Sequence, residues 1–287
     1  MNHQFWRDFR KVVKETNPDA LILAEHYGDG SSWLGGDQWD TIMNYDAFME
    51  PLSWFLTGLE KHSDRADGHL YQNSQAFMCT MLYNMMAAMN ELSNHDHSRF
   101  LTRTNRQVGR LDYRGKAAAS EGINLGIFRA AVVVQMTWPG APTIYYGDEA
   151  GVCGWTDPDS RRTYPWGQED LELMEFHRYL AGIRNWNRAF RTGSFKPLLA
   201  ENGMIAYGRF QENERGVVLV NSESFTQRAQ IPVWEAEVTG DSMDRIMESS
   251  VERYNVGRLP YPVRDGILTV EIGPFCAMIF EEKVLDF

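Results

Sequence analysis

The chain has 287 residues and a formal net charge of −11, from 28 Lys and Arg against 39 Asp and Glu. Its hydrophobic share of 43% and charged share of 23% are those of a folded globular protein and exclude intrinsic disorder. An acidic chain is poorly suited to nucleic acid, and no apolar run approaches the ~20 residues that a bilayer requires. We therefore expect neither nucleic acid nor a membrane among its partners.

Helix-like and strand-like segments alternate over the first 190 residues. Apolar residues between Phe5 and Val13 recur at helical spacing, and this helix should end at Asn17-Pro18, because proline disfavours helical backbone at the preceding residue. The apolar run 20–24 predicts a strand buried on both faces. Further strands are expected at 41–44, 90–94 and 143–146, and further helices at 78–89, 123–134 and 173–183.

The pattern changes near residue 190. Strand-like runs at 205–207, 217–220 and 267–270 follow, separated by turns rich in Gly, Asn and Pro. Alternating strands and helices predict a parallel α/β fold, and the later run of strands predicts an all-β unit. We therefore predict an α/β domain over 1–190 and a C-terminal β-sandwich domain over 191–287.

The cysteines and histidines indicate no metal centre. Cys79, Cys153 and Cys276 are odd in number, far apart and without metal-like spacing, and the seven histidines form no HExxH pattern. Free thiols are typical of a reducing compartment, so we expect a cytoplasmic protein without a transition metal.

Polar clusters follow three of the expected strands. They are Glu25-His26-Tyr27-Gly28, the segment 94–99 (NHDHSR), and Gly147-Asp148-Glu149 with 157–161 (DPDSR) downstream. Ligands of parallel α/β folds bind at the carboxyl ends of the strands. Carboxylates on neighbouring strand ends suit glycoside hydrolysis, although a single Glu after a strand is more often a solvated loop residue.

Several segments occur together in a specific order. Ala24-Glu25-His26 precedes 39–45 (WDTIMNY), and 92–101 (LSNHDHSRFL), 139–149 (PGAPTIYYGDE) and 157–162 (DPDSRR) follow. In this order they resemble motifs of the α-amylase superfamily, glycoside hydrolase family 13. The branch of neopullulanases, cyclomaltodextrinases and maltogenic amylases is the most similar, and the resemblance covers nearly the whole chain.

The resemblance implies two catalytic carboxylates. Glu25 would be the general acid and base, protonating the glycosidic oxygen and later activating water. Asp96 would stabilise the oxocarbenium-like transition state and bind sugar hydroxyls.

The resemblance also implies substrate-binding residues. His95 would hydrogen-bond the sugar at the cleaved bond, and Asp157 and Arg161 would bind a neighbouring glucose on the donor side. His26 and Trp33 are placed on the acceptor side from their positions alone.

The sequence departs from the family pattern in two ways. The residue before Glu25 is Ala24 where the family usually has Gly, which adds a single methyl group. More importantly, the nucleophilic Asp of a GxRxDxAxE motif occurs nowhere in the 287 residues, and His3-Gln4-Phe5-Trp6 resembles the helix that follows this motif. The expected fold class is therefore α/β, the second half (strands five to eight) of a TIM (β/α)8 barrel followed by an all-β sandwich.

Three functions remain open at this level. The chain is expected to be part of a retaining α-glucan hydrolase, inactive alone for want of the nucleophile; a non-catalytic glucan-binding protein or a glucosyl-transferring relative are the alternatives. Half a barrel leaves two open sheet edges, so the partners expected are the missing N-terminal half or a second copy, besides the glucan. No cofactor is expected, and the calcium site of the family would draw mainly on the missing half.

Overall fold

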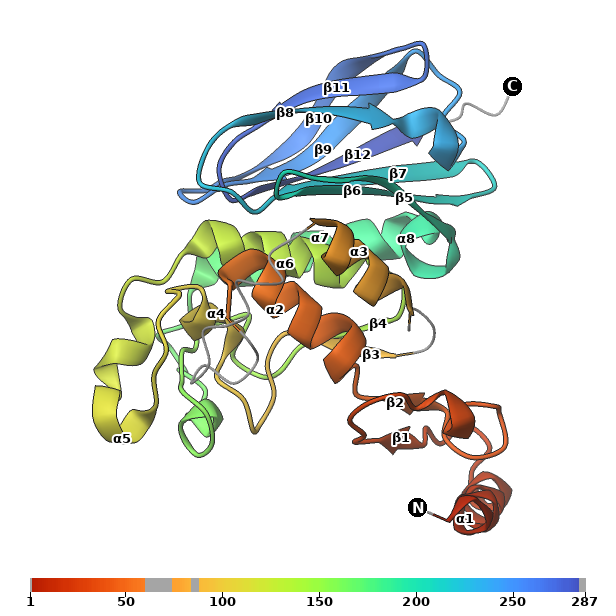
Figure 1. Cartoon of the computed structure of the whole chain (residues 1–287), viewed down its shortest axis with the longest axis vertical. Helices are drawn as coiled ribbons and strands as arrows, with labels where there is room; N and C mark the ends of the chain where they lie inside the picture. The colour runs from red at the N-terminus through yellow and green to blue at the C-terminus, as the bar shows by residue number, and fades with distance from the viewer. Residues whose placement is uncertain (1, 60–73, 84–87, 284–287) are drawn as a thin grey trace.

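The computed structural model describes residues 2–59, 74–83 and 88–283. Figure 1 shows it in layers: an antiparallel β-sheet at one end, helices beneath it, and short parallel strands and the N-terminal helix at the other end. The helices therefore separate the large sheet from the strands that carry the polar clusters.

The N-terminal helix and the four short strands that follow are parallel α/β structure, as expected. Helix α1 (His3–Thr16) begins where the Asn2 side chain accepts a hydrogen bond from the Gln4 amide, and ends before Pro18. Parallel pairing joins β1 (Leu23–Ala24) to β2 (Thr41–Ile42) and β3 (Met89–Glu91) to β4 (Ala141–Thr143). A parallel bridge between Met43 and Met89 connects the two pairs, so the strands lie in sequence order.

Three details of the sequence prediction are wrong. The run at 20–24 is not buried on both faces: Ile22 is buried against α1, whereas Leu21 is 69% exposed and Leu23 40%. The helix expected over 78–89 does not reach Met89, which begins β3, because tertiary pairing prevails over the helical Met spacing there; Met85 and Met86 lie outside the described residues. The strand expected at 143–146 lies earlier, at Ala141–Thr143.

After α1 the chain forms helices of different lengths. They are α2 (Glu50–Thr57), α3 (Ser74–Tyr83), α4 (Phe100–Arg103), α5 (Leu111–Arg114), α6 (Leu125–Thr137), α7 (Leu171–Trp186) and α8 (Arg188–Thr192). Helix α6 is buried around nearly its whole circumference, because the parallel strands lie on one side of it and the large sheet on the other (Figure 1). Its N-terminus is capped by the Asn124 side chain, which accepts from the Ile127 amide.

The C-terminal part is a curled eight-stranded sheet in the order β5-β6-β7-β12-β9-β10-β11-β8. The strands are β5 (Ser194–Glu201), β6 (Met204–Gln211), β7 (Glu214–Asn221), β8 (Gln227–Pro232), β9 (Ser242–Ser249), β10 (Tyr254–Arg264), β11 (Ile267–Ile272) and β12 (Cys276–Lys283). The edge strands β5 and β8 approach each other, so the sheet is nearly closed. The strands expected at 205–207, 217–220 and 267–270 are confirmed as parts of β6, β7 and β11.

Alternation along the central strands builds two cores. In β7, Val218 and Val220 pack on the helices, whereas Val217 and Leu219 point into the interior of the curled sheet. These strands are buried on both faces, which explains their continuous apolar runs. The helices and one face of the sheet thus share a single hydrophobic core.

No helix within the described ranges combines the length and apolar character needed to cross a lipid bilayer.

Candidate active site

Two loops at the carboxyl ends of parallel strands bring carboxylates together. Glu25 directly follows β1, and His95 and Asp96 lie in the loop after β3. One carboxylate oxygen each of Glu25 and Asp96 and one ring nitrogen of His95 all lie within 4.8 Å of one another. His95 Nε2 is 3.3 Å from Asp96 Oδ1. All three are partly exposed, so a solute can reach them. The arrangement offers two carboxylates and an imidazole to one small volume.

The buried side chain of Tyr45 contacts Glu25. Its hydroxyl group donates a hydrogen bond to Glu25 Oε1 at 3.2 Å, and its ring stacks on Tyr27 with centroids 4.6 Å apart. Burial raises the pKa of Tyr45, and the nearby Glu91 and Glu25 raise it further, so the hydroxyl keeps its proton at neutral pH. The motif 39–45 contained Tyr45, yet sequence reasoning assigned it no role, because only tertiary contact places it beneath Glu25.

The loop after β4 lies beside the same residues. Arg161 pairs with Asp157 at 2.8 Å, and its Nε donates to the His95 carbonyl oxygen at 3.2 Å. The backbone amide of Asp157 donates to the Asp96 carbonyl oxygen at 3.0 Å. One backbone and one side-chain donor therefore join the predicted donor-side residues to carbonyl oxygens of the loop that carries Asp96.

A buried ion pair holds these loops in place. Arg99 Nη1 donates to Asp148 Oδ1 at 3.0 Å and Arg99 Nε donates to the Ser160 carbonyl oxygen at 2.9 Å. The Arg99 guanidinium also lies over the Tyr145 ring, 4.2 Å from its centroid. A planar group with several donors suits such a junction. Asp148, part of the third polar cluster, thus has a structural contact rather than an exposed position.

The structure groups His26 and Trp33 with other aromatic rings. Their ring centroids are 5.1 Å apart, and Trp33 stacks on Trp39 at 5.1 Å and on His3 at 5.0 Å. The Trp33 Nε1 atom is buried without a hydrogen-bond partner. The rings of both residues therefore pack in an aromatic cluster between α1 and β2, and their role on the acceptor side stays a prediction.

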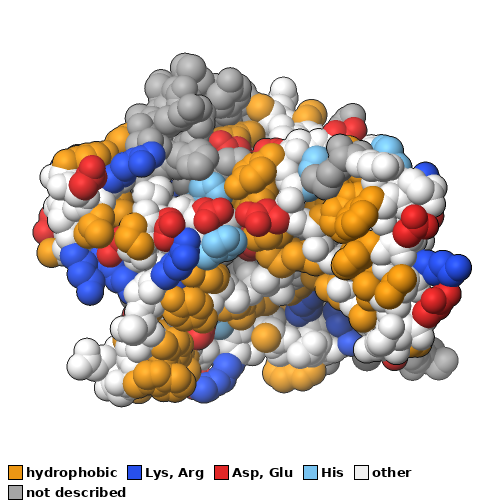
Figure 2. Space-filling view, turned by 90° about the horizontal axis from the view of Figure 1, so that it is seen from below, with side chains coloured by type: hydrophobic (Ala, Val, Ile, Leu, Met, Phe, Trp, Pro, Cys, Tyr) orange, Lys and Arg blue, Asp and Glu red, His pale blue; other side chains and the backbone are white. Residues whose placement is uncertain are grey.

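The candidate site lies on the face turned away from the large sheet. Figure 2 shows acidic side chains beside histidine and Lys or Arg side chains near the middle of this face, with hydrophobic side chains on both sides. Exposed hydrophobic side chains around polar groups are typical of ligand-binding grooves as well as of protein interfaces.

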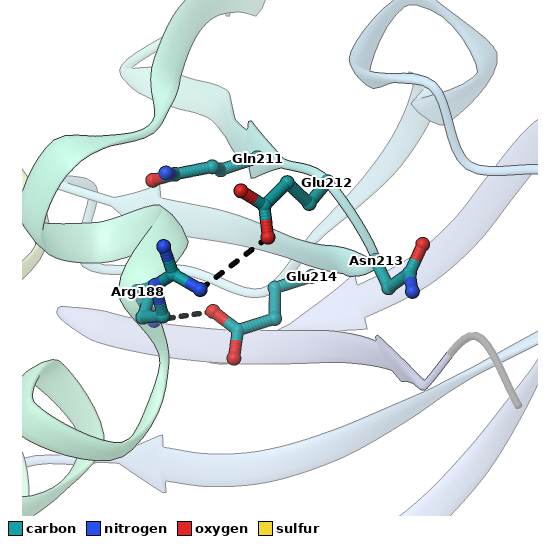
Figure 3. Close-up of a pocket in the computed structure, with 5 residues that line it drawn as sticks. All are labelled: Arg188, Gln211, Glu212, Asn213 and Glu214. Atoms are coloured by element: carbon teal, nitrogen blue, oxygen red, sulfur yellow. Dashed lines mark hydrogen bonds and ion pairs between the residues drawn. The ribbon is translucent and has the colours of Figure 1, made fainter. Parts of the chain in front are cut away.

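A hollow lies far from these loops, at the turn between β6 and β7 (Figure 3). It is lined by Arg188, Gln211, Glu212, Asn213 and Glu214. Arg188 pairs with Glu212 at 3.3 Å, and the Glu214 carboxylate accepts from the Arg188 backbone amide. These charges satisfy one another, so the hollow is no candidate for catalysis.

A family model, curated relatives and solved structures that resemble this chain all belong to the same family of proteins. Residues 1–262 match the family described as "Alpha amylase, catalytic domain". The chain is 37% identical to Neopullulanase 2 of Thermoactinomyces vulgaris over 257 residues, covering 85% of this chain and 40% of the relative. It is 34% identical to a cyclomaltodextrinase of a Bacillus species, covering 78% of this chain and 37% of the relative. The structure resembles the Nostoc punctiforme debranching enzyme with a TM-score of 0.76 and 25% identity, covering 97% of this chain and 55% of that one.

The chain belongs to the α-amylase family. The resemblance to the neopullulanase and cyclomaltodextrinase branch, expected from the motifs, is confirmed. The chain spans less than half the length of the curated relatives it matches.

Proposed function

We propose that this chain is part of a retaining glycoside hydrolase that acts on α-glucosidic bonds of starch-derived oligosaccharides. The observation that carries the proposal is the convergence of Glu25, His95 and Asp96 within 4.8 Å at the ends of two parallel strands. The relatives named neopullulanase and cyclomaltodextrinase support the α-glucan substrate class. In this proposal residues 1–190 form strands five to eight of a (β/α)8 barrel and residues 191–287 a β-sandwich domain.

Each side chain then has a chemical task. Glu25 protonates the glycosidic oxygen as the bond breaks and later takes a proton from the attacking water. Asp96 contributes negative charge where positive charge develops on the sugar ring, and with His95 it binds sugar hydroxyls. Asp157 and Arg161 hold the neighbouring glucose, and His26 and Trp33 flank the acceptor side. Double displacement of this kind requires no cofactor.

A retaining mechanism also needs a nucleophilic carboxylate about 5–5.5 Å from the acid. Glu25 and Asp96 are close enough for such a pair, but the family motif gives Asp96 a different task, and no Asp in a GxRxD setting occurs in the 287 residues. We therefore propose that these residues by themselves hydrolyse α-glucans only at background rate. General acid catalysis alone supplies about 10²- to 10⁴-fold, which is far below typical enzymatic acceleration.

The proposed partner is a second half-barrel that supplies the nucleophile. Among the described residues, β1 pairs with β2 only and β4 with β3 only, so each presents an unpaired edge. Leu21, Leu23 and Ile144 are 69%, 40% and 43% exposed beside these edges. Open edges with apolar side chains favour pairing with further strands. Self-association of this chain is the alternative use of the same surface.

The test is an assay of the purified chain on maltotriose, pullulan and a chromogenic maltoside. It is run with the chain alone and with a separately expressed first half of a related barrel. We expect turnover only in the mixture, lost in Glu25→Gln and retained in Glu121→Gln, an exposed control. Clear turnover by the chain alone that Glu25→Gln abolishes would contradict the missing-nucleophile proposal. A mixture without turnover that binds no maltooligosaccharide would contradict the hydrolase proposal itself.

A further inference from the structure

The turn that carries Asp96 is organised by one amide side chain. Asn94 Oδ1 accepts hydrogen bonds from the Asp96 backbone amide at 3.0 Å and from the His97 backbone amide at 2.9 Å. It also lies 2.9 Å from His97 Nδ1. Because backbone N–H groups can only donate, the oxygen of Asn94 must face them and its NH₂ group must point the opposite way.

Glu91 receives that NH₂ group. Asn94 Nδ2 donates to Glu91 Oε1 at 2.9 Å and lies 4.0 Å from Met49 Sδ. Glu91 ends β3 and is 2% exposed, as is Asn94. A buried carboxyl group in a strand requires a partner, and here the partner is the amide that shapes the site loop.

The same amide is linked to Glu25 by a second route. The His97 ring, held at Nδ1 by Asn94, packs edge-on against Tyr45 with centroids 5.8 Å apart. Tyr45 in turn donates its hydrogen bond to Glu25. Both candidate catalytic carboxylates are therefore connected to Asn94 by contacts, one through the backbone and the other through the rings of His97 and Tyr45.

We propose that Glu91 is a positioning residue of the candidate active site: by accepting the Asn94 amide hydrogen bond, it fixes the turn that holds Asp96 beside Glu25. The proposal rests on the proposed function only in giving this geometry a catalytic use. Glu91 itself touches no substrate, since it lies beneath the loop in the core.

The surroundings of Glu91 favour the protonated, uncharged form of its carboxyl group. Burial raises the pKa of Glu91 to about 8, and Asp148 and Glu25 raise it while Asn94 and Arg103 oppose the shift. At neutral pH the carboxyl is therefore mostly protonated and acts as a hydrogen-bond acceptor without adding a negative charge beside Glu25. A glutamine can supply the same acceptor, whereas a leucine of similar size cannot.

The test uses nitrogen-15 NMR of the His97 ring and the Asn94 side chain in the full chain at pH 7. We expect the proton on His97 Nδ1 in the wild type and in Glu91→Gln, because the amide oxygen has no proton to donate. In Glu91→Leu we expect this signature to be lost and the Asp96 and His97 amide signals to shift. A folded Glu91→Leu with unchanged signals would overturn the proposal.

If Glu91→Leu does not fold, a pH titration of the Asn94 side-chain NMR signal in the wild type tests the contact between Glu91 and Asn94. Ionisation of Glu91 near pH 8 should strengthen its bond to Asn94 and move the Asn94 NH₂ signal, with no such step in Glu91→Gln. Absence of such a step in the wild type at any pH between about 4 and 10 would overturn the proposal.

The rate of glucan hydrolysis tests the catalytic consequence of the Glu91 contact. In a mixture complemented with the first half-barrel, Glu91→Leu should lower kcat at least tenfold with little change in KM, and Glu91→Gln should retain most of it. If the wild-type mixture neither turns over nor binds maltooligosaccharide, the proposed function fails while the NMR result still decides the role of Glu91.

Discussion

The hydroxyl group of Tyr45 donates a hydrogen bond to Glu25 Oε1 across 3.2 Å, from a ring that is almost completely buried. Glu25 is on an exposed loop end, so this contact with the core restricts the directions in which its carboxyl can point.

Tyr45→Phe should leave the stack on Tyr27 in place but remove the hydrogen bond to Glu25. A net loss of about 1 kcal/mol in the free energy of unfolding is expected for one such bond, with reduced turnover in the complemented mixture. Urea unfolding and steady-state kinetics measure the two effects. Tyr113→Phe, at an exposed tyrosine on α5, is the control, and equal behaviour of the two variants would show that the hydrogen bond has no role.

Glu91 should make the stability of the chain fall as pH rises. Its carboxyl loses its proton near pH 4.5 when unfolded but only near pH 8 when folded. Between these values the unfolded state binds fewer protons, so the stability contribution present below pH 4.5 is lost progressively up to about pH 8. Glu91→Gln should remove this dependence and become more stable than the wild type at pH 8, relative to pH 5, by on the order of a few kcal/mol.

Urea unfolding at pH 5, 6, 7 and 8 measures this difference. Glu121→Gln, at an exposed glutamate, should follow the wild type at every pH. Parallel stability curves for Glu91→Gln and the wild type would refute the assignment of a buried, protonated carboxyl.

Gly154→Ala should disturb the loop that carries Asp157 and Arg161. A Cβ at Gly154 would lie 2.4 Å from the Asp159 carbonyl oxygen, a backbone atom that cannot rotate away. The expected cost is about 1–3 kcal/mol, as for other overpacked sites, and glucan binding in the mixture should weaken. Gly273→Ala, where a Cβ meets nothing within 4 Å, is the matched control, and a similar stability for both variants would contradict the prediction.

Arg209 should be essential for attaching the large sheet to the helices. Its Nη1 donates to the carbonyl oxygens of Thr137 at 2.7 Å and Phe190 at 3.2 Å, and its Nη2 to that of Gly193 at 3.0 Å. Arg209→Met leaves the carbonyls of Thr137 and Gly193, near the ends of α6 and α8, without this donor, while Arg184 Nη1 still donates to that of Phe190 at 2.8 Å. The loss should cost at least ~2 kcal/mol.

Thermal unfolding followed by both far-ultraviolet circular dichroism and tryptophan fluorescence tests this prediction. Because helices and sheet share one core, both signals should report a single transition that shifts down in Arg209→Met. Arg191→Met, at an exposed arginine of α8, should leave it in place. Two separate transitions in the wild type would show that the layers unfold independently.

The sequence by itself determined the family, the order of elements and the β-rich C-terminal part. These features follow from residues that are close together in the sequence. Pro18 ends α1, and the runs that form β6, β7 and β11 are rich in apolar and β-branched residues. The motifs at 24–26, 39–45 and 92–101 are specific in combination. The same motifs place Glu25 and Asp96 in one site.

Tertiary structure alone decided which residues support the site and how the strands are buried. Met89 follows a helical spacing but pairs with Ala141 in a strand, and Leu21 and Leu23 are exposed because β1 lies at a sheet edge among the described residues. The contacts of Tyr45 with Glu25 and of Glu91 with Asn94 also depend on packing. Sequence spacing predicts which face a side chain occupies within its own element, whereas its partner and its desolvation depend on elements that are distant along the chain.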